Sequence, residues 1–481
     1  MGNKFLEGNF APVSREHTIT ELRVTGRIPE YLDGRYLRNG PNPLSEVDPA
    51  TYHWFMGDGM VHGVRLRDGR AEWYRNRWVR NPRVSEELGE RWEGGSGSGV
   101  ASMGANTNVI GHAGKTLALI EGGVANFELN DELDTVGACD FDGTLPGGYT
   151  AHPKRDPETG ELHAVSYFFG WGNKVQYSVI DANGRARRKI DIEVTGSPMM
   201  HDFSLTEKYV VFYDLPVTFE TRQAVAASVP SFLRTPAQLV VSALVGKVKV
   251  PDPLSARLRR RVTGNAGLPY RWNPKYPARI GVMPREGGNG DVRWFEVEPC
   301  YVFHPMNAYD DGDSIVLDVV RHPKMFDSEL RGPAEGPPTL DRWTVDLAVG
   351  KVIEERLDDK GQEFPRVDER LLGRRHRFGY SVSTRDGSAS SGSLLKHDLW
   401  NRSVASREFG DGSQVGEFVF VPSSVDADED EGVLMGFVYD AATQKSDLTI
   451  LDAGTLETVG AVHLPDRVPN GFHGNWVGAD G

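Results

Sequence analysis

Short β-forming runs separated by turn residues recur along almost the whole chain. The stretch MVHGVRLRDGRAEWYRNRWV predicts a hairpin around Asp68-Gly69, and VQYSVIDANGRARRKIDIEV predicts another around Asn183-Gly184. Further strand pairs are expected in TLALIEGGVANFELNDELDTVGACDF and LTILDAGTLETVGAVHLP. Helical periodicity is almost absent, and the 55 glycines and 29 prolines favour turns over long helices. The chain is therefore expected to be all-β.

Two architectures accommodate so many short antiparallel strands in 481 residues: packed sandwiches and a β-propeller. A propeller protects its strand edges better, because the blades close around an axis and leave only short edges exposed. No strict repeat period is visible, so the number of blades does not follow from the residues themselves.

Composition and charge restrict the function classes. The formal net charge of -14 argues against a nucleic-acid partner, because phosphates demand clustered lysine and arginine. The two cysteines, Cys139 and Cys300, form no CxxC motif, which fits a reducing compartment. The start of the chain has no secretory pattern, and no apolar run reaches 18 residues. We expect a cytoplasmic protein, with peripheral membrane attachment as an alternative.

Three histidines share one local setting. His152, His201 and His304 are each followed by a polar turn and then by a β-forming run that begins 10, 8 and 11 residues later. Equivalent positions on different propeller blades converge on the central axis, so these side chains are expected to meet there. His473, after a Gly-rich bend, is a fourth candidate.

Four converging imidazoles form a site suited to zinc, copper, iron or nickel. The alternative is that four of 13 histidines share a context by chance. Other histidines lack this setting and are interpreted as structural or surface groups: His53, His62, His112, His163, His322, His376, His397 and His463.

Nine ordered blocks resemble the carotenoid cleavage oxygenase family, which includes the retinal pigment epithelial membrane protein. The blocks are GRYLRNGPNP (34–43), HWFMGDGMVHGVRL (53–66), ANTNVIGHAGKTLALIEGG (105–123), TAHPKRDPETGEL (150–162), MMHDFSLTEKYVVFYD (199–214), VFHPMNAYDDGD (302–313), EFPRVDERLLGRRHRFGY (363–380), GEFVFVP (416–422) and GFHGNW (471–476). The resemblance covers almost the whole chain and implies one domain, residues 1–481. It implies a seven-bladed β-propeller with a helical and loop cap over the iron-bearing axial face.

The resemblance also implies the site. One Fe(II) per chain would be held by His152, His201, His304 and His473. Three carboxylates, Glu121, Glu363 and Glu417, would accept the second ring N–H of His201, His304 and His473 respectively, which leaves His152 without a carboxylate. Thr107 would lie near the open coordination position, where its methyl group restricts access; otherwise it is a strand residue packed in the core.

The implied reaction is cleavage of a conjugated C=C bond of a carotenoid or apocarotenoid by O2, giving two carbonyl products. Stilbene-cleaving members of the family carry a lysine immediately before the first of the three glutamates, and here that residue is Ile120. This departure favours an apolar polyene over a phenolic stilbene, which remains the alternative substrate. A non-catalytic propeller that binds an apolar ligand and uses its metal structurally is the alternative of another class. Candidate tunnel-lining aromatics lie in SYFFGWG (166–172), with Tyr149 and Phe303.

One segment departs from the family pattern. TPAQLVVSALVGKVKVPDPLSARLRRRV (235–262), within an expected helical apolar insertion at about 216–265, has Thr235 as a plausible N-cap and Gly246 as a stop. Its apolar positions Leu239, Val240, Leu244 and Val245 precede a basic flank that suits anionic lipid headgroups. Docking on a membrane surface and packing as a lid over the tunnel are equal alternatives.

Overall fold

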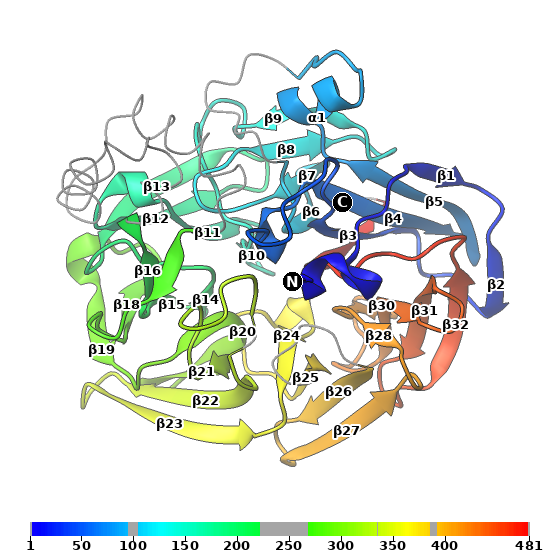
Figure 1. Cartoon of the computed structure of the whole chain (residues 1–481). Coiled ribbons are helices and arrows are strands. Elements are labelled where there is room, and N and C mark those ends of the chain that lie inside the picture. The colour runs from blue at the N-terminus through cyan, green and yellow to red at the C-terminus, as the bar shows by residue number, and fades with distance from the viewer. Residues whose placement is uncertain (1, 95–103, 222–267, 334, 385–391, 480–481) are drawn as a thin grey trace.

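The computed structural model describes residues 2–94, 104–221, 268–333, 335–384 and 392–479. The described residues form seven sheets of four to six strands and one separate two-stranded sheet. Figure 1 shows the larger sheets arranged around a common centre, so the expected all-β, seven-bladed propeller is confirmed. Helical structure in these ranges is short: η1 (Lys4–Leu6), η2 (Gly8–Phe10), η3 (Trp54–Met56), α1 (Pro82–Glu87), η4 (Phe169–Trp171), η6 (Asn289–Asp291) and η7 (Glu369–Leu371).

The first three blades are formed mainly by the N-terminal half of the chain. One blade has the strand order β1-β5-β4-β3-β33, with bounds β1 (His17–Ile19), β3 (Gly34–Pro41), β4 (Gly59–Arg67), β5 (Arg70–Trp78) and β33 (Gly474–Gly478). The next contains β6 (Asn108–His112), β7 (Lys115–Leu119), β8 (Asn126–Leu129) and β9 (Thr135–Cys139). The third contains β10 (Lys154–Arg155), β11 (Leu162–Tyr167), β12 (Lys174–Ile180) and β13 (Ala186–Glu193).

The other four blades follow in chain order. They comprise β14 (Phe203–Leu205), β15 (Tyr209–Asp214), β18 (Arg279–Pro284) and β19 (Arg293–Glu296); then β20 (Tyr301–Asp311), β21 (Ser314–His322), β22 (Thr339–Asp346) and β23 (Lys351–Asp358). The sixth contains β24 (Gln362–Arg366), β25 (Phe378–Ser383), β26 (Ser393–Asp398) and β27 (Ser403–Glu408). The last contains β2 (Arg23–Gly26), β28 (Gln414–Val415), β29 (Val419–Pro422), β30 (Gly432–Asp440), β31 (Lys445–Asp452) and β32 (Thr458–His463).

The ring closes by exchanging strands between the two ends of the chain. N-terminal β2 pairs with β32 of the last blade, in the register Arg23↔His463. C-terminal β33 pairs with β3 of the first blade, in the register Arg38↔Gly474. Each blade at the seam therefore contains strands from both ends of the chain.

Aromatic side chains pack between neighbouring blades. The ring of Tyr36 on β3 lies 5.1 Å from that of Phe437 on β30. Tyr380 on β25 stacks on Phe420 of β29 with centroids 6.2 Å apart. Such pairs bury large apolar surfaces and prefer offset or edge contacts. The core is therefore distributed around the ring, between adjacent sheets.

Both predicted hairpins are present. The turn between β4 and β5 contains Asp68 and Gly69, each with positive φ (49° and 68°), which suits an Asp-Gly pair. The turn between β12 and β13 has Gly184 at φ 80°. The Asp181 side chain accepts the backbone N–H groups of Asn183 and Arg185 there.

The histidine repeat corresponds to the innermost strands of the blades. His152 and His201 stand two residues before the short strands β10 and β14, and His304 lies within β20. The β-forming runs that identified the three histidines are the second strands of these blades, β11, β15 and β21. The polar turn that follows each histidine therefore joins the innermost strand of the blade to its neighbour.

The expected apolar insertion falls largely outside the described residues, because 235–262 belongs to the undescribed range 222–267. Its described beginning is a strand: β16 (Val217–Phe219) pairs with β17 (Tyr270–Trp272). The predicted helix begins only at Thr235, so it lies outside the described residues and stays a prediction. Within the described ranges, no helix has the length and apolar character needed to cross a bilayer.

Candidate metal centre

The four candidate histidines meet at the centre of the ring. His152, His201, His304 and His473 are all buried, and one ring nitrogen of each lies within 4.8 Å of the others. His473 directly precedes β33, and two backbone hydrogen bonds hold it in place. Its carbonyl accepts the Asn39 N–H, and its own N–H donates to the Thr107 carbonyl at 3.1 Å.

Three carboxylates accept the outer Nδ1–H groups of this cluster. Nδ1 of His201 lies 2.8 Å from Glu121 Oε1, and Nδ1 of His304 lies 2.7 Å from Glu363 Oε2. Nδ1 of His473 lies 3.0 Å from Glu417 Oε1. These contacts match the pairs that the family resemblance implies.

The inner nitrogens fit a bound cation. Because Nδ1 donates to a carboxylate in His201, His304 and His473, the neutral tautomer leaves a lone pair on each Nε2. Nε2 of His201 lies 3.3 Å from Nε2 of His304, and Nε2 of His152 lies 3.0 Å from Nε2 of His473. Lone pairs at such distances repel unless a positive charge lies between them. A divalent transition metal satisfies all four, since neutral imidazole is its common protein ligand.

His152 differs from the other three. Its Nδ1 is buried and has no hydrogen-bond partner within the described parts of the chain. Burial, and then the charges of the neighbouring histidines, hold the pKa of His152 well below its usual value. The ring is therefore neutral near pH 7 and has a lone pair available for a metal.

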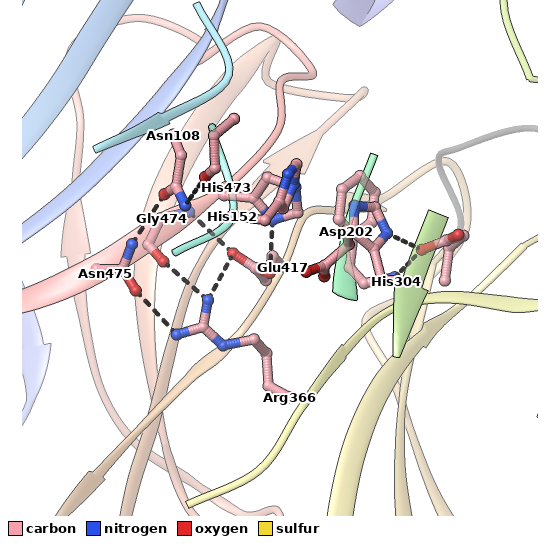
Figure 2. Close-up of polar contacts among 12 residues, drawn as sticks. Asn108, His152, Asp202, His304, Arg366, Glu417, His473, Gly474 and Asn475 are labelled. Atoms are coloured by element: carbon pink, nitrogen blue, oxygen red, sulfur yellow. Dashed lines mark hydrogen bonds and ion pairs between the residues drawn. The ribbon is translucent and has the colours of Figure 1, made fainter. Parts of the chain in front are cut away.

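Each carboxylate is also held by a second side chain, which sequence reasoning missed. The Tyr167 hydroxyl donates to Glu121 Oε1 at 2.9 Å, and Nε2 of His322 donates to Glu363 Oε1 at 2.7 Å. Figure 2 shows the third case, where Glu417 lies near Arg366; the ion pair measures 3.4 Å. The interpretation of His322 as a merely structural or surface group is corrected, since its ring lies in the hydrogen-bond chain to His304.

These partners keep the buried carboxylates ionised. Burial alone would raise the pKa of Glu363, but His304 and His322 outweigh it and lower that pKa below its ordinary value. Burial would also raise the pKa of Glu417. Arg366 and His473 lower it by more, so the pKa of Glu417 is about 2. Two full negative charges thus face the histidine cluster and offset part of the charge of a dication.

A strained backbone orients Glu363. The next residue, Phe364, has φ 53°, a left-handed conformation that is uncommon for a bulky side chain. The pairing register of β24 with β25 shifts at this point. The Phe364 N–H donates to Glu363 Oε2, and the Phe364 ring stacks on His304 with centroids 5.7 Å apart. This bulge turns the carboxylate toward the cluster and covers one face of His304.

Thr107 lies beside the cluster, immediately before β6. Its hydroxyl donates to Asn106 Oδ1 at 2.9 Å, and the Asn106 amide donates to the carbonyls of Phe55 and Gly57. These bonds fix the Thr107 rotamer and occupy its hydroxyl hydrogen. Its side chain lines the cavity described next.

A large, mostly apolar cavity ends at the histidines. About 1100 Å³ of space, solvent at the opening included, lies between its walls, and its lining includes His201, His304 and His473. Ile120 also lines the cavity. It is the residue for which the family resemblance implies a lysine in stilbene-cleaving members. Aromatic lining residues are Trp54, Phe55, Tyr167, Phe169, Tyr270, Phe303, Phe364 and Phe472.

The prediction of tunnel-lining aromatics is confirmed for Tyr167, Phe169 and Phe303. Phe168 and Trp171 of the same stretch are not among the lining residues. The prediction is also wrong for Tyr149, which packs in a separate core cluster with its ring 4.8 Å from Phe141. Loops and the short helix η3 form part of the cavity wall. In Figure 1 the N-terminal segment lies over the centre of the ring.

The family model for the retinal pigment epithelial membrane protein matches residues 10–478. A protein of Mycobacterium tuberculosis named carotenoid cleavage oxygenase is 58% identical over 99% of this chain and 97% of its own length. The chain belongs to the carotenoid cleavage oxygenase family. A carotenoid 9,10(9',10')-cleavage dioxygenase of Crocus sativus, another relative, is 31% identical over 98% of this chain and 89% of its own.

Solved structures of the carotenoid cleavage oxygenase family share the fold. Lignostilbene dioxygenase of Pseudomonas brassicacearum superposes with a TM-score of 0.81 at 25% identity and covers 99% of this chain and 98% of its own. The cobalt-substituted apocarotenoid oxygenase of Synechocystis superposes with a TM-score of 0.79 at 26% identity, with 97% of each chain covered.

Proposed function

We propose that this chain is an Fe(II)-dependent dioxygenase that cleaves a conjugated C=C bond of a carotenoid or apocarotenoid. One molecule of O2 is consumed, and each product receives one oxygen atom as a carbonyl group. The observation that carries the proposal is the four-histidine cluster at the inner end of an apolar cavity, in a chain of the carotenoid cleavage oxygenase family.

His152, His201, His304 and His473 would hold the metal through Nε2, and Glu121, Glu363 and Glu417 would fix the tautomers of the last three. Ferrous iron, when bound, supplies the redox chemistry that activates dioxygen. Relatives named oxygenase and dioxygenase act with O2, whose activation requires a redox-active metal, and this favours iron over zinc. Thr107, which lines the cavity beside the histidines, would restrict access to the bound metal.

The cavity's side chains would bind and orient the substrate. An apolar polyene matches a lining dominated by aromatic and aliphatic groups, and its burial excludes water from the histidines. The carboxylates of Glu121 and Glu363 both accept N–H groups from histidines, and of their four oxygens only Oε2 of Glu121 has no partner among the described residues. The chain would therefore contribute mainly positioning.

A phenolic stilbene is the second candidate substrate. Structural similarity to a lignostilbene dioxygenase favours it, whereas an apolar Ile120 beside the histidines opposes it. Burying the phenolate of a stilbene in such a cavity costs free energy unless a cation, such as a lysine ammonium group, pairs with it.

A panel assay separates the candidates. Iron-loaded protein is incubated with O2 and either polyenes or hydroxystilbenes, and products are identified by mass spectrometry. We expect pairs of carbonyl products from polyenes, with masses that sum to substrate plus O2. Cleavage of stilbenes alone would favour the second candidate. Binding of both classes with no cleavage would favour a non-catalytic propeller.

Substrate delivery is part of the proposal. Polyenes are nearly insoluble in water, so the protein would collect them from a membrane surface or a carrier while residing in the cytoplasm. Co-sedimentation with anionic and neutral liposomes tests binding to a membrane surface. Absence of binding to both kinds of liposome would point to a carrier. The basic segment 235–262 is the proposed contact, and it lies outside the described residues.

A further inference from the structure

Nearly all polar groups that line the apolar cavity are already bonded within the protein. The Thr107 hydroxyl donates to Asn106 Oδ1, and the Asn106 NH2 group donates to the backbone carbonyls of Phe55 and Gly57. The Tyr167 hydroxyl donates to Glu121, and Glu363 receives N–H groups from two histidines. Groups engaged in this way are not available to a ligand.

Tyr270 is different. It lies on β17, lines the cavity and is only 5% exposed. Its hydroxyl has no hydrogen-bond partner in the protein, as judged from the described residues. Buried tyrosine hydroxyls usually find a partner, because an unsatisfied polar group costs free energy. A cavity-lining hydroxyl without one is available to a ligand.

The Tyr270 ring is held rigidly. It makes edge contacts with Tyr167 at 5.8 Å and Phe219 at 5.6 Å between centroids. Tyr167 is itself bonded to Glu121, the partner of His201, so Tyr270 lies at the end of the cavity close to the metal cluster. Burial and the nearby Glu121 carboxylate raise the pKa of Tyr270, so the hydroxyl keeps its proton and remains a donor.

The indole N–H of Trp54 is the other lining donor without a partner among the described residues. Trp54 is packed in an aromatic cluster with Phe5, Phe10 and Phe472 near the N-terminal segment. Tyr270, by contrast, packs on Tyr167, which is bonded to Glu121, so it is the better placed of the two for a contact beside the metal cluster.

We propose that the Tyr270 hydroxyl donates a hydrogen bond to an oxygen atom of the substrate, which makes the chain selective for oxygen-bearing polyenes over hydrocarbon carotenes. This inference rests on the proposed function and narrows its substrate class. The oxygen belongs to an aldehyde, ketone or hydroxyl group, each of which accepts from a phenol. A hydrocarbon in the same position leaves the hydroxyl unpaired, and this penalty produces the discrimination.

The test uses the iron-loaded full chain, a hydrocarbon carotene and a polyene aldehyde. The measured quantity is the ratio of kcat/KM for the aldehyde to kcat/KM for the carotene. Tyr270→Phe should lower this ratio roughly three- to ten-fold, the size of one neutral hydrogen bond. Tyr167→Phe is the matched control: it removes a hydroxyl that is bonded to Glu121, so it should change both values by the same factor.

Binding provides a second measurement. Kd values of both polyenes for the metal-free protein, from quenching of intrinsic fluorescence, should show the same fall in ratio for Tyr270→Phe. An unchanged ratio in both measurements overturns the inference, and it is the outcome expected if a buried water molecule satisfies Tyr270. Discrimination in binding without turnover of any polyene would instead count against the proposed function and leave the Tyr270 contact standing.

Discussion

Glu363 joins His304 to His322 through its two carboxylate oxygens. Oε2 accepts from Nδ1 of His304 and Oε1 accepts from Nε2 of His322, both at 2.7 Å. Glu121 is used differently: its Oε1 receives both His201 and Tyr167, whereas its Oε2 has no partner in the described structure. The two carboxylates therefore respond differently to the same substitution.

Glu363→Gln should weaken metal binding more than Glu121→Gln. A glutamine at 363 must direct its NH2 group at one of two histidine N–H donors, whereas a glutamine at 121 keeps an oxygen for both of its donors. We expect a loss of on the order of 10- to 100-fold in metal affinity for Glu363→Gln and a smaller one for Glu121→Gln. Titration of the metal-free variants with Co²⁺ or Fe²⁺ under anaerobic conditions measures both. Equal losses would contradict the asymmetry.

Replacing any one of the four clustered histidines with alanine should abolish iron binding and turnover while the propeller remains folded. The reason is that each ring supplies one nitrogen to a site whose donor atoms lie within 4.8 Å of one another. Metal analysis and circular dichroism of His152→Ala, His201→Ala, His304→Ala and His473→Ala check this. His463→Ala, on a partly exposed edge, is the control. Wild-type iron content in two or more of the four would rule out the assignment.

Ile120→Lys should lower polyene turnover. Ile120 is 5% exposed and lines the cavity beside Glu121, so the substitution introduces an ammonium group into an apolar wall. Polyene kcat/KM is expected to fall at least ten-fold, and the preference should shift toward hydroxystilbenes. Ile120→Met, which keeps volume and polarity, is the matched control. Polyene turnover at the wild-type level in Ile120→Lys would show that this wall does not contact the substrate.

Acid should destabilise the fold through His53. Burial, and then Arg271, lower its pKa to about 3, and its Nδ1 accepts the Phe55 N–H at 3.1 Å. In the unfolded chain His53 binds a proton below about pH 6.5, whereas in the folded chain it stays neutral until about pH 3. Protonation therefore does not reduce the free energy of unfolding above about pH 6.5. Below that pH, the free energy of unfolding falls by about 1.4 kcal/mol per pH unit as pH drops toward about 3.

His53→Asn keeps an acceptor for Phe55 and removes this titration. Between pH 7.5 and pH 5.0, the free energy of unfolding should fall by about 2 kcal/mol less in this variant than in the wild type. Denaturant unfolding at the two pH values measures the difference. Identical losses in both proteins would show that His53 does not contribute to acid sensitivity.

The sequence by itself determined the local features. Asp68-Gly69 and Asn183-Gly184 specified hairpin turns, because their backbone requirements are met within a few residues. The recurrence of a histidine, a polar turn and a strand marked three of the four clustered histidines. The ordered family blocks supplied His473 and the three glutamates.

Only the tertiary structure decided which residues from different blades meet. His322 reaches Glu363, Tyr167 reaches Glu121 and Arg366 reaches Glu417 through contacts that span 41 to 51 residues of chain. Tyr149 and Tyr270 are both buried aromatics, yet only Tyr270 lines the cavity. Strand alternation and turn chemistry are local, whereas these contacts depend on how seven sheets close into a ring, with β2 and β33 exchanged across the seam.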